Sequence, residues 1–192
     1  MKQKIAKIVR VATLAPIIAL IAATIMFVCK PEIFGDAATY ILTLVFLTVL
    51  PLLAYPLHPV FPAIRDKGRS GQRTLAMIMA VVGYILGIIF ALVWQLSQTL
   101  FMFFLTYLLS GLLLLLFNKG FKIKASGHAG GVSGPIVFLI YVFGPVALWG
   151  IPVLIAVYWA SLCMKRHTPG ELAFGSVIPP AAVLIAWLLL SL

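Results

Sequence analysis

Two of the three histidines in this chain lie in short polar segments that also carry lysine, arginine and glycine. His128 follows K-A-S-G, and His167 lies in K-R-H-T-P-G-E, each before an apolar stretch long enough to be a helix. The first backbone N–H groups of a helix bind anions, and glycine lets a phosphate group approach the backbone closely. Lysine and arginine neutralise the remaining negative charge. The pattern favours a phosphate site over a basic anchor with incidental histidines.

Two imidazoles can carry out phosphoryl transfer without a metal. One ring attacks phosphorus while the other protonates the leaving oxygen. A carboxylate one helical turn after the attacking histidine can hold its second ring nitrogen, and Glu171 stands four residues after His167. The chain has only four acidic residues, so we expect no metal site and no cofactor. His58 has apolar neighbours, and we assign it a structural or interfacial role.

The segments that must position these residues are strongly apolar. The chain is 64% hydrophobic and 9% charged, whereas a soluble domain is about 45–50% apolar and about 25% charged. We expect an all-α, polytopic transmembrane helical bundle of six or seven spans, with residues 1–192 forming a single membrane domain. The expected spans are 11–29, 38–64, 74–96, 99–117, 133–148, 152–164 and 172–192.

Prolines and glycines refine this picture. Residues 125–164 contain no Asp, Glu, Lys or Arg, and as one helix they would measure about 60 Å, so we expect a turn within residues 144–152. Gly83 and Gly87 predict close helix packing. We expect the second stretch to be helical to about Tyr55 and then to form a bent re-entrant or interfacial piece, because four prolines interrupt it: Pro51, Pro56, Pro59 and Pro62.

The net charge of +10 predicts an anionic partner. We expect membrane lipids and a lipid phosphate, and no nucleic acid, because no loop is large enough to hold one. With seven spans, thirteen of the fourteen lysines and arginines fall on one face, which the positive-inside rule makes cytoplasmic. We therefore expect a multi-pass protein, in the plasma membrane if the source is prokaryotic, with Leu192 on the outer side. The basic segments are 2–10, 65–73, 119–124 and 165–166.

At its histidines the sequence resembles the type-2 phosphatidic acid phosphatase superfamily of integral-membrane lipid phosphatases. That family has the motifs K-x6-R-P, P-S-G-H and S-R-x5-H-x3-D. Residues 125–128, A-S-G-H, match the second motif except for alanine in place of proline. His167 and Glu171 match the end of the third, with glutamate in place of aspartate, and its arginine would fall on Ser161, with Arg166 as a substitute.

The first motif is matched only approximately. Lys67 and Arg73 are one residue too close together, and Thr74 follows where the family has proline. The order of the three motifs fits the family, and so do the two crossings between the second and the third.

The resemblance implies a role for each matched residue. His167 would be the nucleophile that forms a phosphohistidine, Glu171 would orient it, and His128 would be the general acid. Ser126 and Gly127 would cradle the phosphate group through backbone N–H and hydroxyl groups. The cations expected to neutralise the phosphate are Lys67, Arg73 and Arg166, with Arg69 and Lys124 as further candidates.

The expected function is that of a metal-independent hydrolase acting on a lipid phosphate. Its substrate would be a polyprenyl phosphate or diphosphate, or a phosphatidate-type lipid. The charge rule places the active site at the cytoplasmic face, whereas many characterised relatives face the other way. The alternative is a non-catalytic lipid-phosphate carrier or flippase, which prolines within spans and glycine-rich segments would suit.

The charge pattern predicts that Gly120 is cytoplasmic and that Ser97 is external. In a variant whose Cys29 and Cys163 are replaced by serine, a cysteine introduced as Gly120→Cys should resist an impermeant thiol reagent added to intact cells. One introduced as Ser97→Cys should react, because an odd number of crossings separates the two positions. The opposite labelling pattern would reverse the orientation.

Overall fold

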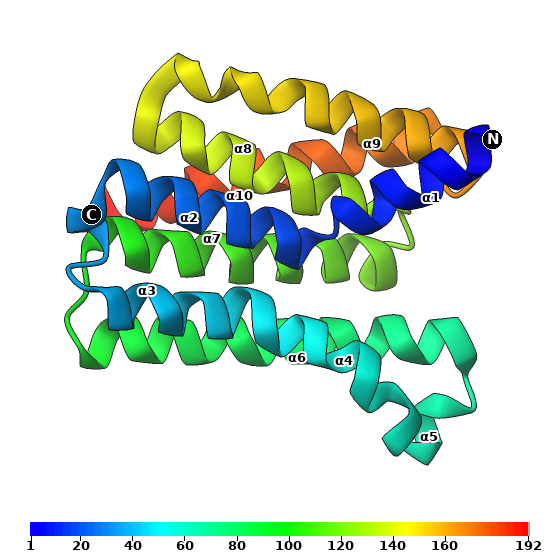
Figure 1. The fold of residues 1–192 in the computed structure, drawn as a ribbon, viewed down its shortest axis with the longest axis horizontal. Helices are drawn as coiled ribbons and strands as arrows, with labels where there is room; N and C mark the ends of the chain where they lie inside the picture. Colours follow the sequence, from blue (N-terminus) through cyan, green and yellow to red (C-terminus); the bar gives the residue numbers. More distant parts are fainter. Residues whose placement is uncertain (192) are drawn as a thin grey trace. The chain divides into compact units, whose positions relative to one another are not determined.

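In the computed structural model, residues 1–191 are described, without the side chain of Arg69, and every regular element in this part is helical (Figure 1). The predicted all-α class is confirmed. The longer helices are α1 (Lys2–Ala12), α2 (Ala15–Cys29), α3 (Ala37–Leu44), α4 (Leu50–Leu57), α6 (Gly68–Val93), α7 (Gln98–Leu115), α8 (Gly127–Phe143), α9 (Ile151–Cys163) and α10 (Pro169–Ser191).

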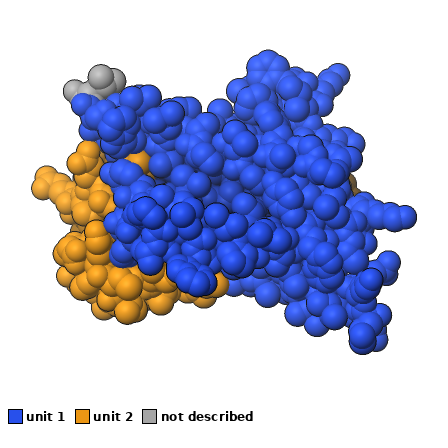
Figure 2. Space-filling view, turned by 90° about the horizontal axis from the view of Figure 1, so that it is seen from above, with its two compact units in different colours: residues 1–18, 105–192 blue, residues 19–104 orange. Residues whose placement is uncertain are grey.

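The chain divides into two compact units, coloured separately in Figure 2. Unit 1 holds residues 1–18 and 105–192, and unit 2 holds residues 19–104. The expectation of a single membrane domain over residues 1–192 stays a prediction.

Within residues 1–191, five helical segments are long and apolar enough to cross a bilayer. The pair α1 and α2, bent by 53°, makes a sixth. This number of segments roughly fits the predicted six or seven spans. Several apolar helices of this length are typical of a multi-pass membrane protein. The five segments are Ala37–Val60, Ser70–Val93, Gln98–Gly120, Gly127–Cys163 and Pro169–Ser191.

In unit 1, the segment Gly127–Cys163 folds back on itself as a helical hairpin. After α8, Gly144 adopts φ +76°, and a 3₁₀ segment, Gly144–Gly150, leads into α9. Val132 and Ile136 of α8 pack against Val157 of α9, and Figure 1 shows the two helices running in opposite directions. The turn predicted within residues 144–152 is confirmed.

Also in unit 1, α8 and α10 pack with their backbones close together. A Cβ atom added at Gly175 would lie 2.3 Å from the backbone oxygen of Ser126, and one at Gly130 would lie 2.9 Å from that of Gly175. Gly134 faces the ring of Pro179 in the same way, at 3.1 Å. Small residues allow such an approach between apolar helices.

This contact explains why the helix starts earlier than predicted. The sequence predicts a span over residues 133–148, yet α8 begins at Gly127. Glycines are poor helix formers in isolation. Here the close packing of Gly130 and Gly134 on α10 outweighs that preference, and Ser126 caps the helix.

In unit 2, a π-helical turn, Val45–Val49, joins α3 to α4. In a π turn each N–H donates to the carbonyl five residues earlier, as the Leu50 N–H does to the Val45 carbonyl. The corresponding donor to the Phe46 carbonyl would be Pro51, which has no N–H. That carbonyl lies against Gly83 of α6, where an added Cβ would be 2.2 Å from its oxygen. The predicted close packing at Gly83 is confirmed, and Gly87 contacts the Phe104 ring similarly.

The end of the second stretch is bent, as predicted. After α4 come a 3₁₀ turn, His58–Val60, and a short helix, α5 (Pro62–Arg65). A ring nitrogen of His58 lies 3.3 Å from the Ile64 carbonyl oxygen, a contact that holds this turn. The basic loop predicted over residues 65–73 is wrong in its second part, because α6 begins at Gly68. Hydropathy shows only where the apolar part of a helix ends. Arginine and glutamine are good helix formers, so α6 extends beyond its apolar part.

Gly83→Ala should lower the free energy of unfolding in detergent by about 1–3 kcal/mol, because its methyl group would collide with the Phe46 carbonyl. Thermal unfolding of the purified protein measures the effect. Val82→Ala, at the exposed neighbouring position of α6, is the control and should shift the midpoint far less. An unchanged midpoint for Gly83→Ala would contradict this account of the packing.

Candidate active site

The connection between α9 and α10 is a tight turn that carries His167. Lys165 has φ +52°, its N–H donates to the Leu162 carbonyl, and the Arg166 N–H donates to the Ser161 carbonyl. These two bonds form a Schellman motif, which closes a helix by reversing the chain at a left-handed residue. The motif fixes Arg166 and His167 just beyond the end of α9.

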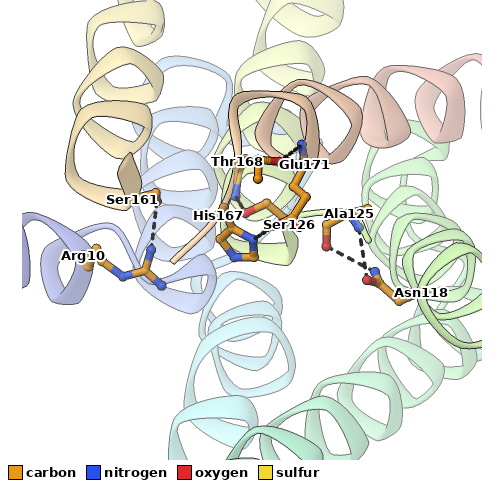
Figure 3. A network of polar contacts seen from close by, with 9 residues as sticks. Arg10, Asn118, Ala125, Ser126, Ser161, His167, Thr168 and Glu171 are labelled. Carbon is orange, nitrogen blue, oxygen red and sulfur yellow. Dashed lines mark hydrogen bonds and ion pairs between the residues drawn. The ribbon is translucent and has the colours of Figure 1, made fainter. Parts of the chain in front are cut away.

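His167 and Glu171 form the best-defined polar pair of the site (Figure 3). His167 Nδ1 lies 2.8 Å from Glu171 Oε2, and about a fifth of each side chain is exposed. A carboxylate can only accept, so Nδ1 carries the proton of this contact, and in the neutral form of the ring Nε2 is the nitrogen with a lone pair. Thr168 caps α10 by accepting from the Glu171 N–H at 3.2 Å, which fixes the turn on which both residues sit. This is the contact that the predicted orienting role of Glu171 requires.

The start of α8 is tied directly to the first turn of α10. Ser126 N–H donates to the Glu171 carbonyl at 2.8 Å, and Ser126 Oγ accepts from the Ala129 N–H at 3.3 Å. Ser126 is fully buried. Its N–H therefore holds the two helices together while its hydroxyl caps α8, and the helix-start N–H groups that can face an anion are those of Gly127 and His128.

His128 lies in the first turn of α8 and contacts α1. Its Nε2 atom is 3.0 Å from Thr13 Oγ1, and Thr13 Oγ1 donates its only hydrogen to the Val9 carbonyl at 2.7 Å. His128 Nε2 is therefore the donor in the contact with Thr13. Nδ1 is the ring nitrogen that remains to gain or lose a proton.

Asn118, which is not among the predicted site residues, holds the segment that leads into α8. Its side chain donates to the Ala125 carbonyl at 3.2 Å and accepts from the Ala125 N–H at 3.1 Å (Figure 3). The pair of bonds fixes the backbone one residue before Ser126. A lone asparagine among apolar and basic residues carries no sequence signal for this contact.

Arg10 makes another contact that the sequence pattern does not indicate. Its Nη1 atom donates to Ser161 Oγ at 2.8 Å, a contact between α1 and α9 that is drawn as a dashed line in Figure 3. Arg10 and His167 both act electrostatically on His128. In the sequence, Arg10 indicates only the orientation of the chain in the membrane.

No protein-family model, curated protein or solved structure matches this chain. The resemblance to the lipid phosphatase superfamily stays a prediction.

The structure brings some of the predicted site residues together. Ser126, Gly127, His128, His167 and Glu171 gather at one end of unit 1 through the bonds described above. Within the described part of the chain, no three His, Cys, Asp or Glu side chains are close enough to hold a metal ion.

The predicted cations are divided between the two units. Lys124 is exposed and acts electrostatically on Glu171, and the side chain of Arg166 is exposed beside His167. Lys67 and Arg73 are exposed and belong to unit 2, and their part in the site stays a prediction. Arg69 lies in α6 of the same unit, with its side chain outside the described part.

Gly175→Ala should separate the start of α8 from α10, because its methyl group would lie 2.3 Å from the Ser126 carbonyl oxygen. We expect the free energy of unfolding to fall by about 1–3 kcal/mol. Amide hydrogen exchange around residues 125–130 should accelerate as the bond from Ser126 to Glu171 weakens. Gly170→Ala is the matched control, since an added Cβ there meets nothing within 4 Å. Equal effects of the two substitutions would rule out the close contact.

Proposed function

We propose that this protein is a metal-independent membrane phosphatase that hydrolyses a lipid phosphate through a phosphohistidine. The observation that carries the proposal is the 2.8 Å contact between His167 Nδ1 and Glu171 Oε2, next to the helix start that holds His128. A histidine held in this way presents Nε2 as a nucleophile, and the carboxylate stabilises the positive charge that develops on the ring.

In the proposed reaction, His167 Nε2 bonds to phosphorus as the bond from phosphorus to the lipid oxygen breaks. His128 gives a proton to that oxygen, which leaves as a lipid alcohol, or as a lipid monophosphate if the substrate is a diphosphate. Water then bonds to phosphorus as the bond between His167 Nε2 and phosphorus breaks. His128 accepts a proton from this water, and inorganic phosphate leaves. The N–H groups of Gly127 and His128 would bind phosphate oxygens throughout.

A lipid substrate is favoured because the site residues stand at the ends of strongly apolar helices. A polyprenyl phosphate or diphosphate and a phosphatidate-type lipid both combine such a tail with the phosphate chemistry above. We further propose seven crossings, counting α8 and α9 separately and α1 with α2 as one, and an active site at the cytoplasmic face. The basic N-terminal residues support this orientation, and an even number of crossings places each site loop on the same side as these residues.

The test is phosphate release from polyprenyl phosphates, polyprenyl diphosphates and phosphatidate by the purified protein in detergent, with EDTA present. We expect turnover with EDTA, trapping of acid-labile phosphate on the wild-type protein, and loss of both in His167→Ala. His58→Ala is the matched control, because it removes the histidine that holds a turn in unit 2.

Turnover that needs magnesium, or near-normal turnover in His167→Ala, would refute the proposed mechanism. Binding of lipid phosphate without any release by the wild-type protein would instead identify the carrier alternative.

A further inference from the structure

Thr13 stands between α1 and α2, and the hydrogen of its hydroxyl group has a fixed partner. The backbone N–H and the Oγ1 atom of Thr13 both donate to the Val9 carbonyl, at 2.9 and 2.7 Å. Only 8% of the residue is exposed, so water has little access to these bonds. Because a hydroxyl group carries one hydrogen, Thr13 Oγ1 can only accept in any further contact.

That further contact is with His128, the second residue of α8, whose Nε2 atom lies 3.0 Å from Thr13 Oγ1. Both residues belong to unit 1. Within residues 1–191 the ring of His128 makes no other hydrogen bond. Nε2 therefore carries a hydrogen in both the neutral and the charged form of the ring, and Nδ1 is the nitrogen left open.

The open nitrogen is the one nearer to the start of α8. In a histidine side chain, Nδ1 is bonded to the ring carbon next to Cβ, whereas Nε2 lies on the distal side of the ring. The backbone N–H of His128 is one of the two helix-start groups that can face an anion. A Cβ atom added at Gly127 would meet nothing within 4 Å, so there is room beside these groups. A phosphate group bound here would have Nδ1 closer to its oxygens than Nε2.

We propose that Thr13 is a positioning residue of the candidate site. It holds His128 in the tautomer with its hydrogen on Nε2, so that Nδ1 is the atom that gives a proton to the lipid oxygen and later takes one from water. The hydrogen on Nε2 stays in place throughout. The role in proton transfer rests on the proposed function, whereas the tautomer rests on the bonds of Thr13 alone.

The chain of bonds suits a ring whose charge changes during a reaction. The Val9 carbonyl polarises the Thr13 hydroxyl, and the hydroxyl oxygen then stabilises the N–H of a charged imidazole more strongly, since bonds in such a chain reinforce one another. Without Thr13 Oγ1, a buried ring N–H would lose its acceptor. The ring could then turn over about its bond to Cβ, which would put a carbon atom in the place of Nδ1.

A purely structural role is the competing explanation, since the same bond fastens Thr13 to α8. Thr13→Val and Thr13→Ser separate the two roles, because valine keeps the shape of threonine without the hydroxyl group and serine keeps the hydroxyl group. We expect kcat for phosphate release to fall about 10- to 100-fold in Thr13→Val and to stay within about threefold of wild type in Thr13→Ser. KM should change far less than kcat, because Thr13 acts through His128.

Thr24→Val is the matched control. Thr24 donates to the Leu20 carbonyl at 2.7 Å and meets the Tyr40 hydroxyl at 2.8 Å, which is the same arrangement in unit 2. Thr24→Val should therefore lower the unfolding temperature by a similar amount and leave kcat unchanged. A wild-type kcat in Thr13→Val, equal losses in Thr13→Val and Thr13→Ser, or a similar loss in Thr24→Val would each overturn the role of Thr13 in turnover.

Nitrogen NMR of isotope-labelled histidine rings tests the tautomer without turnover. At a pH where the ring is neutral, His128 of the wild-type protein should show an unprotonated Nδ1 and a protonated Nε2 whose hydrogen exchanges slowly with water. Thr13→Ser should keep this signature, and Thr13→Val should lose the slow exchange. The signals of His128 are those absent from His128→Gln. A protonated Nδ1 in the neutral ring of the wild-type protein would overturn the inference, whether or not Thr13→Val folds.

The two proposals fail separately in these measurements. The expected NMR signature without any phosphate release would refute the phosphatase and keep Thr13 as the residue that sets the tautomer of His128. Phosphate release at the wild-type rate in Thr13→Val, with the Nε2 hydrogen still in slow exchange, would overturn the role of Thr13 and keep the phosphatase.

Discussion

The hydrogen bond from Ser126 N–H to the Glu171 carbonyl holds together parts of the chain that are 45 residues apart, and the candidate site depends on it. It forms only because α8 and α10 approach with their backbones nearly in contact, which Gly130 and Gly175 allow. In a setting of low dielectric constant, a backbone hydrogen bond of this kind is strong and its loss is costly. It sets the helix start that carries His128 against the turn that carries His167 and Glu171.

The local parts of the site could be predicted from the sequence. A histidine and a glutamate four residues apart meet across one helical turn, and the structure shows that contact at 2.8 Å. The reversal between α8 and α9 followed from length alone, because 40 uncharged residues exceed one crossing. The close packing at Gly83 followed from residue size. Its partner, the Phe46 carbonyl, could not be predicted, because the π turn beside Pro51 leaves no periodic signal in the sequence.

The contacts made by α1 and Asn118 could not be predicted in this way. Arg10 and Ser161 are 151 residues apart, and only the packing of α1 on α9 brings them together. The charges of α1 had a sufficient explanation as topology signals, so nothing in the pattern pointed to a contact between Arg10 and α9. The start of α8 was misplaced for a related reason: Gly130 and Gly134 lower helix propensity locally, and their packing against α10 becomes visible only in three dimensions.

The hairpin of α8 and α9 also bears on the lipids around it. With 17 and 13 residues, these helices measure about 26 and 20 Å, less than the roughly 30 Å hydrocarbon thickness of a typical bilayer. Such a hydrophobic mismatch is relieved when the adjacent leaflet thins or when the polar end of the hairpin sinks below the headgroup level. For the proposed phosphatase, either adjustment would bring the phosphorus of a neighbouring lipid to the depth of the start of α8. The lipid would then present its headgroup sideways from the membrane plane, with its tail still dissolved in the bilayer.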